Sequence, residues 1–507
     1  MSGTATPTIV NFTEIPYTWK VPGQYMEIKP ALNENAVLPF PARGLIIGQM
    51  YAAGTAVPGT IYPLYSPAQA KGLFGAGSIL AEMCSSWLAA NPYLPVDVVG
   101  VLDATGAAAA AGSVTIAGAA TAAGTLALEL AGVRLPVAVN IGDTADEVAT
   151  NIYDAFQQLP ALSGSSVPSL LMAYVGGTAV TNLTAGNAGT LGNQLAVLLN
   201  MQSGDVTPPG LTVTIVPMSG GATDPTATVS AVLAGITSTW YTDVAFPWTD
   251  ATNTLTFTTW MAGRYGAMAK LDVQGYVATT GTYGTVLTYE PNSQFLTILP
   301  VQNSRAPTWK IAAGLAGACC YSTAQQPSLQ MKTVVLPGIV APLDVNLFSL
   351  DERESLLENG FSTFYSDSTG AFYLERVTTS RRSDPASNAP DLAWFDLCAT
   401  KVPTRVRYDW DNYIGALYPR ANLAQDGSIA AQYSDNVVTP SDLTAQWAGR
   451  SRVYEENGWI QNSAATVKNS VFVIDAQDGN RVDSRQQIQI MGNLMVLAGS
   501  LEFISTN

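Results

Sequence analysis

The chain has 507 residues and a net charge of −15, because 38 acidic residues outnumber 23 basic ones. Only 12 % of its residues are charged and 47 % are hydrophobic, which excludes an intrinsically disordered chain. The acidic balance argues against nucleic-acid binding as the main task, since phosphate contacts need clustered lysine and arginine. No apolar run approaches the roughly 18–20 residues of a membrane-spanning helix, so we predict no membrane insertion.

Catalytic machinery is equally hard to find. The sequence contains no histidine, which excludes Ser-His-Asp and Cys-His catalysis and every histidine-ligated metal site. Neither a phosphate-binding loop nor a Gly-x-Ser-x-Gly motif occurs. The four cysteines are too few for a disulfide scaffold, and no secretory signal is recognisable at the N-terminus. We therefore predict no enzyme, no cofactor, no metal site and no catalytic residue.

The N-terminal third indicates an arm, then an α/β domain. Residues 1–24 form the predicted arm, in which Thr8–Ile15 reads as a strand without a neighbour to pair with. Residues 25–104 then alternate strands at 43–48 and 96–102 with helices at 66–73 and 78–91. Ser66 followed by Pro67 is a typical helix start.

Composition changes sharply after residue 104. Residues 105–223 are rich in Ala, Gly, Thr and Ser, with four alternating strands and one helix at 143–158, for which Asp143 is the expected N-cap. We predict an inserted β-rich domain. From 224 to 342 strands and helices alternate again, which predicts a mostly parallel sheet that begins before the insertion and resumes after it.

The last third is predicted to be α+β. Residues 343–496 contain a hairpin of strands 359–365 and 371–377, helices at 391–412 and 441–457, and a strand at 471–474. Residues 488–503 are apolar and strand-competent, and 497–507 form the predicted C-terminal arm. The predicted fold class is therefore multidomain α/β and α+β, with an inserted β-rich domain and extended arms at both ends.

The two arms are the strongest positive signal in the sequence. Both carry apolar strand-like residues without an evident partner, which favours donation of these strands to sheets of neighbouring copies over pairing within the chain. Homo-oligomerisation would also hide surface on a chain with so few charges. The residues expected in the donated strands are Ile9, Val10, Phe12, Ile15, Leu497, Leu501, Phe503 and Ile504.

Basic residues are unevenly distributed. Residues 44–263 contain two of them, Lys71 and Arg134, whereas residues 376–507 contain twelve of the 23. Chance explains this asymmetry about as well as two ends that face different partners. A cation site at Asp409 and Asp411 is possible, but a helix end without a third ligand explains the pair better.

Several ordered motifs resemble those of the tail sheath proteins of Mu-like contractile bacteriophages. They are FTEIP at 12–16, GLFGAGSIL at 72–80, WLAANP at 87–92, WYTD at 240–243, LPGIVAP at 336–342, NGFSTF at 359–364 and LERV at 374–377. Within the predicted insertion, AGVRL at 131–135 and GDTADEV at 142–148 also match. The resemblance covers nearly the whole chain.

The resemblance implies a structural virion protein. Sheath subunits of this family stack as hexameric rings around an inner tail tube and contract to drive it through the host envelope. The implied partners are further copies, the inner tube protein, and baseplate and tail terminator proteins, with assembly in the host bacterial cytoplasm. The insertion should face outward and the C-terminal part the tube. The resulting candidates for tube or inter-ring contacts are Lys401, Arg405, Arg407, Arg450, Arg452 and Lys468.

Three alternatives stay open at this stage. The chain could be the sheath of a phage-derived injection particle without a capsid. A histidine-free carboxylate hydrolase would need two acidic residues roughly 5–9 Å apart in a cleft, and no such pair stands out in the sequence. An acidic surface-layer protein or adhesin would need an export signal.

Overall fold

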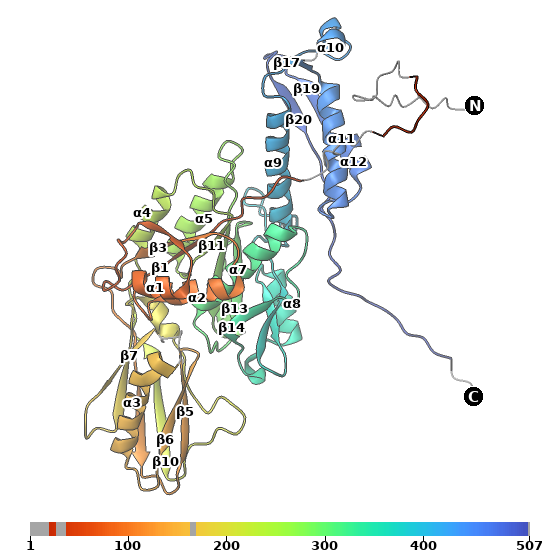
Figure 1. Ribbon diagram of the computed structural model, residues 1–507. Coiled ribbons are helices and arrows are strands. Elements are labelled where there is room, and N and C mark those ends of the chain that lie inside the picture. The colour runs from red at the N-terminus through yellow and green to blue at the C-terminus, as the bar shows by residue number, and fades with distance from the viewer. Residues whose placement is uncertain (1–19, 27–36, 163–168, 435, 505–507) are drawn as a thin grey trace.

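The computed structural model describes residues 20–26, 37–162, 169–434 and 436–504, with residues 160–162 described by their backbone alone. Figure 1 shows an elongated molecule in three parts. A central body lies between the segment 105–223 at one end and a group of long helices at the other. The fold is a mixed α/β arrangement with several sheets, as predicted.

A six-stranded sheet with the strand order β13-β12-β11-β1-β3-β2 organises the body. Its neighbouring strands are parallel except for β2 and β3, so the predicted mostly parallel sheet is confirmed. Three of the strands precede residue 105 and three follow residue 223. The strands are β1 (Gly44–Gln49), β2 (Ile61–Leu64), β3 (Val96–Val101), β11 (Asp243–Ala245), β12 (Gln274–Thr280) and β13 (Leu296–Val301).

Helices lie against this sheet. Within the described residues, the helices of this part of the chain are α1 (Pro67–Phe74), α2 (Ile79–Ala90), α4 (Thr226–Gly235), α5 (Ala251–Tyr265), α6 (Tyr283–Val286) and α7 (Thr308–Gln325). The side chain of Ser66 caps α1 by accepting from Gln69 N at 3.2 Å, as the Ser-Pro start predicted. Helices α2 and α7 pack so closely that a Cβ added to Gly317 would lie 2.9 Å from the carbonyl oxygen of Trp87.

The segment 105–223 contains two antiparallel sheets, ordered β10-β4-β8-β7 and β6-β5-β9. Its elements are β4 (Ala111–Gly118), β5 (Gly124–Leu130), β6 (Val133–Val139), α3 (Ala145–Leu162), β7 (Leu170–Tyr174), β8 (Val180–Ala185), η1 (Thr190–Gln194), β9 (Val197–Leu199) and β10 (Leu211–Ser219). The prediction of Asp143 as the cap of α3 is wrong. Thr144 Oγ1 accepts from Glu147 N instead, and Glu147 Oε2 accepts from Thr144 N.

Buried and partly buried polar contacts join this segment to the body. Arg305, which follows β13, donates from Nε to Glu129 Oε1 of β5 at 2.8 Å. At the end of β1, Gln49 Nε2 donates to Ala188 O and to Asp103 Oδ1, both at 2.7 Å. Asp103 in turn accepts from the amide of Ala188 at 2.8 Å. Because these groups are largely away from water, each depends on its partner across the seam.

The C-terminal third begins with a three-stranded sheet and continues into a helical part that we call the C-terminal module (residues 398–490). The first part contains β14 (Val335–Val340), η2 (Asp344–Asn346), α8 (Leu350–Glu358), β15 (Thr363–Ser366) and β16 (Ala371–Arg376). The module contains α9 (Cys398–Leu417), β17 (Asn422–Leu423), α10 (Ile429–Tyr433), β18 (Val437–Val438), α11 (Pro440–Glu456), α12 (Ser463–Lys468), β19 (Val471–Ile474) and β20 (Val482–Arg485). Strands β15 and β16 form the predicted hairpin.

One sequence prediction in this region is wrong. The helix predicted from 391 begins at Cys398, because the residues before it are held in loops by ion pairs of Arg381 with Asp391 and of Arg376 with Asp396. The apolar stretch 488–503 is not a strand of this subunit within the described residues. One isolated bridge pairs Ile490 with Ile460, and no further strand of the described chain lies beside it. Across the described ranges, none of the helices is both long and apolar enough to cross a bilayer.

Candidate assembly surfaces

The C-terminal module has a hydrophobic cluster of its own, separate from that of the body. It contains Val402, Val406, Trp447, Tyr454, Trp459, Ile460 and Phe472. A buried ionic group lies beside it: Asp409 of α9, fully buried, accepts from Arg450 Nε at 3.0 Å and from Tyr454 OH at 2.7 Å. Leu38 N also donates to Asp409, at 2.9 Å. These bonds explain Asp409 as the partner of a buried arginine rather than as a metal ligand.

Strands β19 and β20 form a two-stranded hairpin in this module. Its two strands pair with each other over four residues each, from Val471 with Arg485 to Ile474 with Val482. Within the described residues neither strand has a second neighbour. Phe472 points into the cluster, while Val471 and Val473 on the other face are 44 % and 49 % exposed. A two-stranded sheet is marginally stable alone and offers unpaired backbone groups along both edges.

The C-terminal tail (residues 496–504) leaves its own subunit. Figure 1 shows it running away from the foot of the module into open space. Leu497, Leu501, Phe503 and Ile504 are 86 %, 95 %, 87 % and 96 % exposed. Several apolar side chains this exposed in one short segment are typical of a surface that contacts another molecule. The other predicted arm residues, Ile9, Val10, Phe12 and Ile15, lie outside the described residues.

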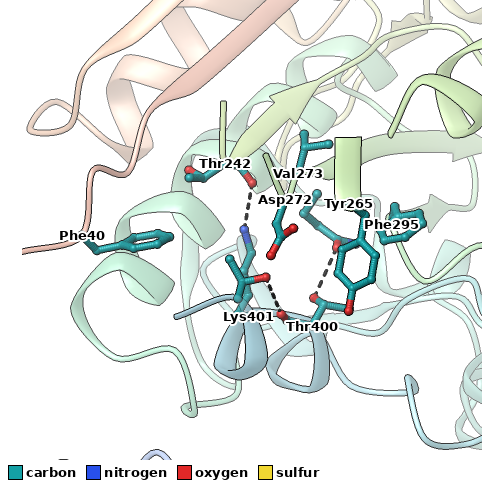
Figure 2. Close-up of a pocket in the computed structure, with 10 residues that line it drawn as sticks. Phe40, Thr242, Tyr265, Asp272, Val273, Phe295, Thr400 and Lys401 are labelled. Atoms are coloured by element: carbon teal, nitrogen blue, oxygen red, sulfur yellow. Dashed lines mark hydrogen bonds between the residues drawn. The ribbon is translucent and has the colours of Figure 1, made fainter. Parts of the chain in front are cut away.

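Three of the six candidate basic contacts are buried inside the subunit, which corrects their expected place on the surface. Lys401 of α9 donates from Nζ to Asp243 Oδ1 at 2.7 Å and to Thr242 O at 3.0 Å, and Figure 2 shows its ammonium pointing at that carbonyl. It lines a cavity of about 20 Å³, which is room for about one water molecule. Its role is to fasten α9 to the first residue of β11.

Arg405 and Arg450 are internal as well. The guanidinium of Arg405 lies between the rings of Phe40 and Trp459, at 4.6 Å and 5.1 Å from their centroids. Burial lowers the pKa of Arg405 to about 10, because desolvation disfavours the charged form. Arg450, 3 % exposed, is the partner of Asp409. The amphipathic pattern of α9 and α11 does not distinguish these inward arginines from outward ones.

The remaining three basic candidates keep some exposure. Arg407 forms an ion pair with Asp272 of the body and retains 28 % of its side-chain exposure. Arg452 is 79 % exposed and pairs with Glu456 one helical turn away at 3.0 Å. Lys468 is exposed in the last turn of α12. These three stay available for a contact with another protein.

Neither metal binding nor thiol chemistry has support in the described part of the chain. Its Cys, Asp and Glu residues form no group of three or more that could hold a metal ion. Burial raises the pKa of the Cys84, Cys319 and Cys320 thiols, which keeps them protonated and unreactive. The most distinctive surface is thus the pair formed by an open hairpin and an unpartnered apolar tail.

The known proteins that are similar to this chain include a tail sheath protein. The chain is 29 % identical over 501 residues to the Mu-like prophage FluMu tail sheath protein of Haemophilus influenzae, covering 98 % of this chain and 99 % of the relative. The chain is similar to a Mu-like tail sheath protein over nearly its full length. The resemblance predicted from the sequence motifs is therefore confirmed. This similarity supports the interpretation that the chain is a structural component of a contractile phage tail or injection system.

Solved structures add distant neighbours. The sheath tail proteins from Desulfitobacterium hafniense and Listeria innocua each align with a TM-score of 0.48 and 12 % identity, over 92 % and 91 % of this chain and 100 % and 94 % of theirs. A baseplate structure of the anti-feeding prophage aligns with a TM-score of 0.45 and 10 % identity over 96 % of this chain and 99 % of that chain. No family model matches the chain. The full-length sequence match carries the assignment.

The sequence predicts a hairpin turn at 475–480, but sequence reasoning missed the strand that returns from it, β20. Strand β20 has the sequence Val-Asp-Ser-Arg, and with three polar residues out of four it lacks the alternation of apolar and polar residues that predicts a strand. The available signal was the turn at Asp478-Gly479 directly after the apolar β19, since such a dipeptide often joins two paired strands.

Proposed function

We propose that this chain is the subunit of a contractile tail sheath. Copies polymerise as stacked hexameric rings around an inner tail tube, and contraction of the stack drives the tube through the host envelope. Their further partners are the baseplate and tail terminator proteins, and the particle assembles in the host bacterial cytoplasm. The observation that carries this proposal is the apolar C-terminal tail, which leaves a subunit related over its full length to a tail sheath protein.

The C-terminal tail and the β19–β20 hairpin each expose apolar side chains and unpaired backbone groups that pairing with the other would bury. The tail carries apolar side chains on alternate positions, with Leu501 and Phe503 on one face of an extended segment. The hairpin has open edges and two half-exposed valines beside them. A strand added to β19 or β20 would bury these groups together, and each fully buried Leu or Phe contributes about 1.5–3 kcal/mol before ordering costs. We assign the β19–β20 hairpin as the acceptor for a neighbouring copy's tail.

Other parts of the chain fit into this scheme as follows. The N-terminal arm, residues 1–24, supplies a second donated strand at about 8–15. Residues 25–104 with 224–342 form the core domain and 105–223 an inserted outer domain, while 343–496 form the tube-facing domain. Arg407, Arg452 and Lys468 remain as proposed contacts to the tube or to the next ring. The burial of Lys401, Arg405 and Arg450 removes those three from the proposed set.

Truncation of the tail tests strand donation. Removal of residues 498–507 should leave a folded subunit with the melting temperature of the full chain, because these residues contact nothing else among the described residues of the subunit. The truncated chain should form no tubes at concentrations at which the full chain does, as judged by negative-stain electron microscopy.

A matched pair of point variants sharpens this test. Phe503→Ser removes an apolar side chain from the proposed buried face and should weaken polymerisation, whereas Glu502→Ser changes the neighbouring position and should not. Normal tubes from the truncated chain would contradict the donated-strand role. Normal tubes from Phe503→Ser alone would contradict the proposed face.

A further inference from the structure

The segment that precedes the free tail is fixed to its own subunit, and we call residues 489–495 the strap. We propose that the strap aims the tail by holding its base across the joint between the C-terminal module and the body. This inference rests on the proposed strand donation and names the residues that position the donated strand. It concerns Asn493 and Lys332 above all.

The first half of the strap is attached to the module. Gln461 N donates to Gln489 O at 2.8 Å, and Met491 N donates to Trp459 O at 3.1 Å. Ile490 lies opposite Ile460 in an antiparallel bridge. Because Trp459 and Ile460 belong to the hydrophobic cluster of the module, the strap starts from a rigid support.

The second half of the strap is attached to the body and to the start of α9. Asn493 Oδ1 accepts from Gln330 N at 3.2 Å, and its Nδ2 donates to Cys398 Sγ at 3.5 Å. Two residues further along, Met495 O accepts from Lys332 Nζ at 3.3 Å. Gln330 and Lys332 precede β14, so the strap crosses from one part of the subunit to the other.

Gln330 is itself held in place. Its Nε2 donates to Asp396 Oδ1 at 2.8 Å, and its Oε1 accepts from Val377 N at 3.2 Å. Asp396 is bound by two nitrogens of Arg376, at 2.9 Å and 3.0 Å. The amide that meets Asn493 is thus part of a fixed network rather than of a loose loop.

The exposure of the side chains shows where the contacts of the strap with its own subunit end. Along the strap, Met491, Asn493 and Met495 are partly covered, while Gly492 and Leu494 between them are exposed, which is the period of an extended segment lying on a surface. From residue 496 onward every described residue is exposed. The chain therefore leaves the subunit directly after the contact of Lys332 with Met495, in a direction set by the strap.

A fixed base matters because a donated strand must reach one particular edge of a neighbouring copy. Fixing the direction of departure raises the concentration of the tail near that edge and lowers the entropy lost on pairing. Loss of the Asn493 side chain removes two hydrogen bonds. We expect assembly to become about tenfold slower, which corresponds to about 1.4 kcal/mol of activation free energy.

The test measures the direction of the tail in the unassembled subunit. Spin labels are placed at Ser500→Cys in the tail and at Ala464→Cys on α12, an exposed position. All four natural cysteines are buried and free, so the introduced ones react selectively. The distribution of label-to-label distances is recorded at concentrations below assembly for the otherwise natural chain and for Asn493→Ala, Lys332→Met and Asn469→Ala. The last is a control at an exposed asparagine.

We expect Asn493→Ala and Lys332→Met to widen the distance distribution and to slow assembly about tenfold by light scattering, with Asn469→Ala unchanged. Lys332 is exposed, so its substitution tests the strap even if Asn493→Ala folds poorly. An unchanged distribution in both strap variants would overturn the inference. So would a wider distribution with unchanged assembly. Failure of strand donation itself is seen separately, as tube formation by the truncated chain, while the distances in the unassembled subunit do not depend on it.

Discussion

The body and the C-terminal module treat the edges of their sheets in opposite ways. In the body, one edge strand, β2, is four residues long and contains Pro63, which cannot donate a ladder hydrogen bond. The other, β13, is covered by hydrogen bonds from Ser362 N and Ser380 N to its carbonyls. In the module, the hairpin β19–β20 is left with open edges within the described residues.

This difference indicates that the sheet of the body serves folding of the subunit, whereas the hairpin of the module can serve assembly between copies. The two edges of the sheet of the body are thus blocked by a proline or covered by other residues of the same subunit. The module buries one face of its hairpin by packing Phe472 of β19 into the hydrophobic cluster that contains Trp447, and it leaves the backbone groups at the hairpin edges unpaired within the described residues. An open edge next to a free apolar tail promotes pairing between copies, whereas closed edges in the body keep the copies from pairing there.

The largest effect is expected from a variant that tests whether the module unfolds on its own. Arg450→Met leaves the fully buried Asp409 without its cationic partner and should cost about 3–5 kcal/mol. Because the module has a separate hydrophobic cluster, calorimetry should show a new transition at lower temperature while the body transition stays in place.

The control for this variant is Arg452→Met, in the same helix. Its side chain is 79 % exposed, so the free energy of unfolding should change by no more than about 0.5 kcal/mol. A single transition that moves as a whole in Arg450→Met would show that body and module unfold together, and the contrast between them would then apply to assembly alone.

The packing of the body is tested by adding one methyl group. Gly317→Ala places a Cβ 2.9 Å from the carbonyl oxygen of Trp87, where α2 and α7 touch. The backbone cannot move aside easily, so we expect a loss of about 1–3 kcal/mol in urea unfolding. Gly449→Ala in α11 meets no atom within 4 Å and should gain about 0.5–1 kcal/mol, because alanine favours the helix. Equal effects at the two sites would contradict tighter packing in the body.

A smaller effect is expected for the pH dependence of the free energy of unfolding of the body. Burial raises the pKa of the Glu82 carboxyl, which accepts from Trp309 Nε1 at 2.7 Å. The folded state therefore binds this proton more tightly than the unfolded state. The stability linked to it is present below the ordinary glutamate pKa, near 4.3, and is lost as the pH rises through the raised value.

Glu82→Gln stays neutral and keeps an acceptor for Trp309. Urea unfolding at pH 4, 6 and 8 should show little difference from the natural chain at pH 4. At pH 8 the variant should gain at least about 1.4 kcal/mol, the equivalent of one unit of pKa difference. A difference that does not vary with pH would show that Glu82 keeps its ordinary pKa in the folded protein.

Local features of this protein were predictable from its sequence. The Ser-Pro start of α1, the alternation that produced the parallel sheet and the hairpin β15–β16 are short-range patterns, and the structure has all three. The ordered motifs were likewise enough for the resemblance to tail sheath proteins. The apolar, strand-like composition of the C-terminal tail was also evident in the sequence, and the structure leaves this tail exposed on its own subunit.

Tertiary structure alone decided which charges face inward and which segments pair. Lys401, Arg405 and Arg450 resemble surface residues in sequence, yet each is buried by an element far away in the chain: Asp243 of β11, Phe40 before β1, and Asp409 of α9. Residues 488–503 look like a strand, but a strand exists only where a second one lies beside it. Burial and strand pairing depend on contacts between distant residues, and a local pattern of residues does not contain those contacts.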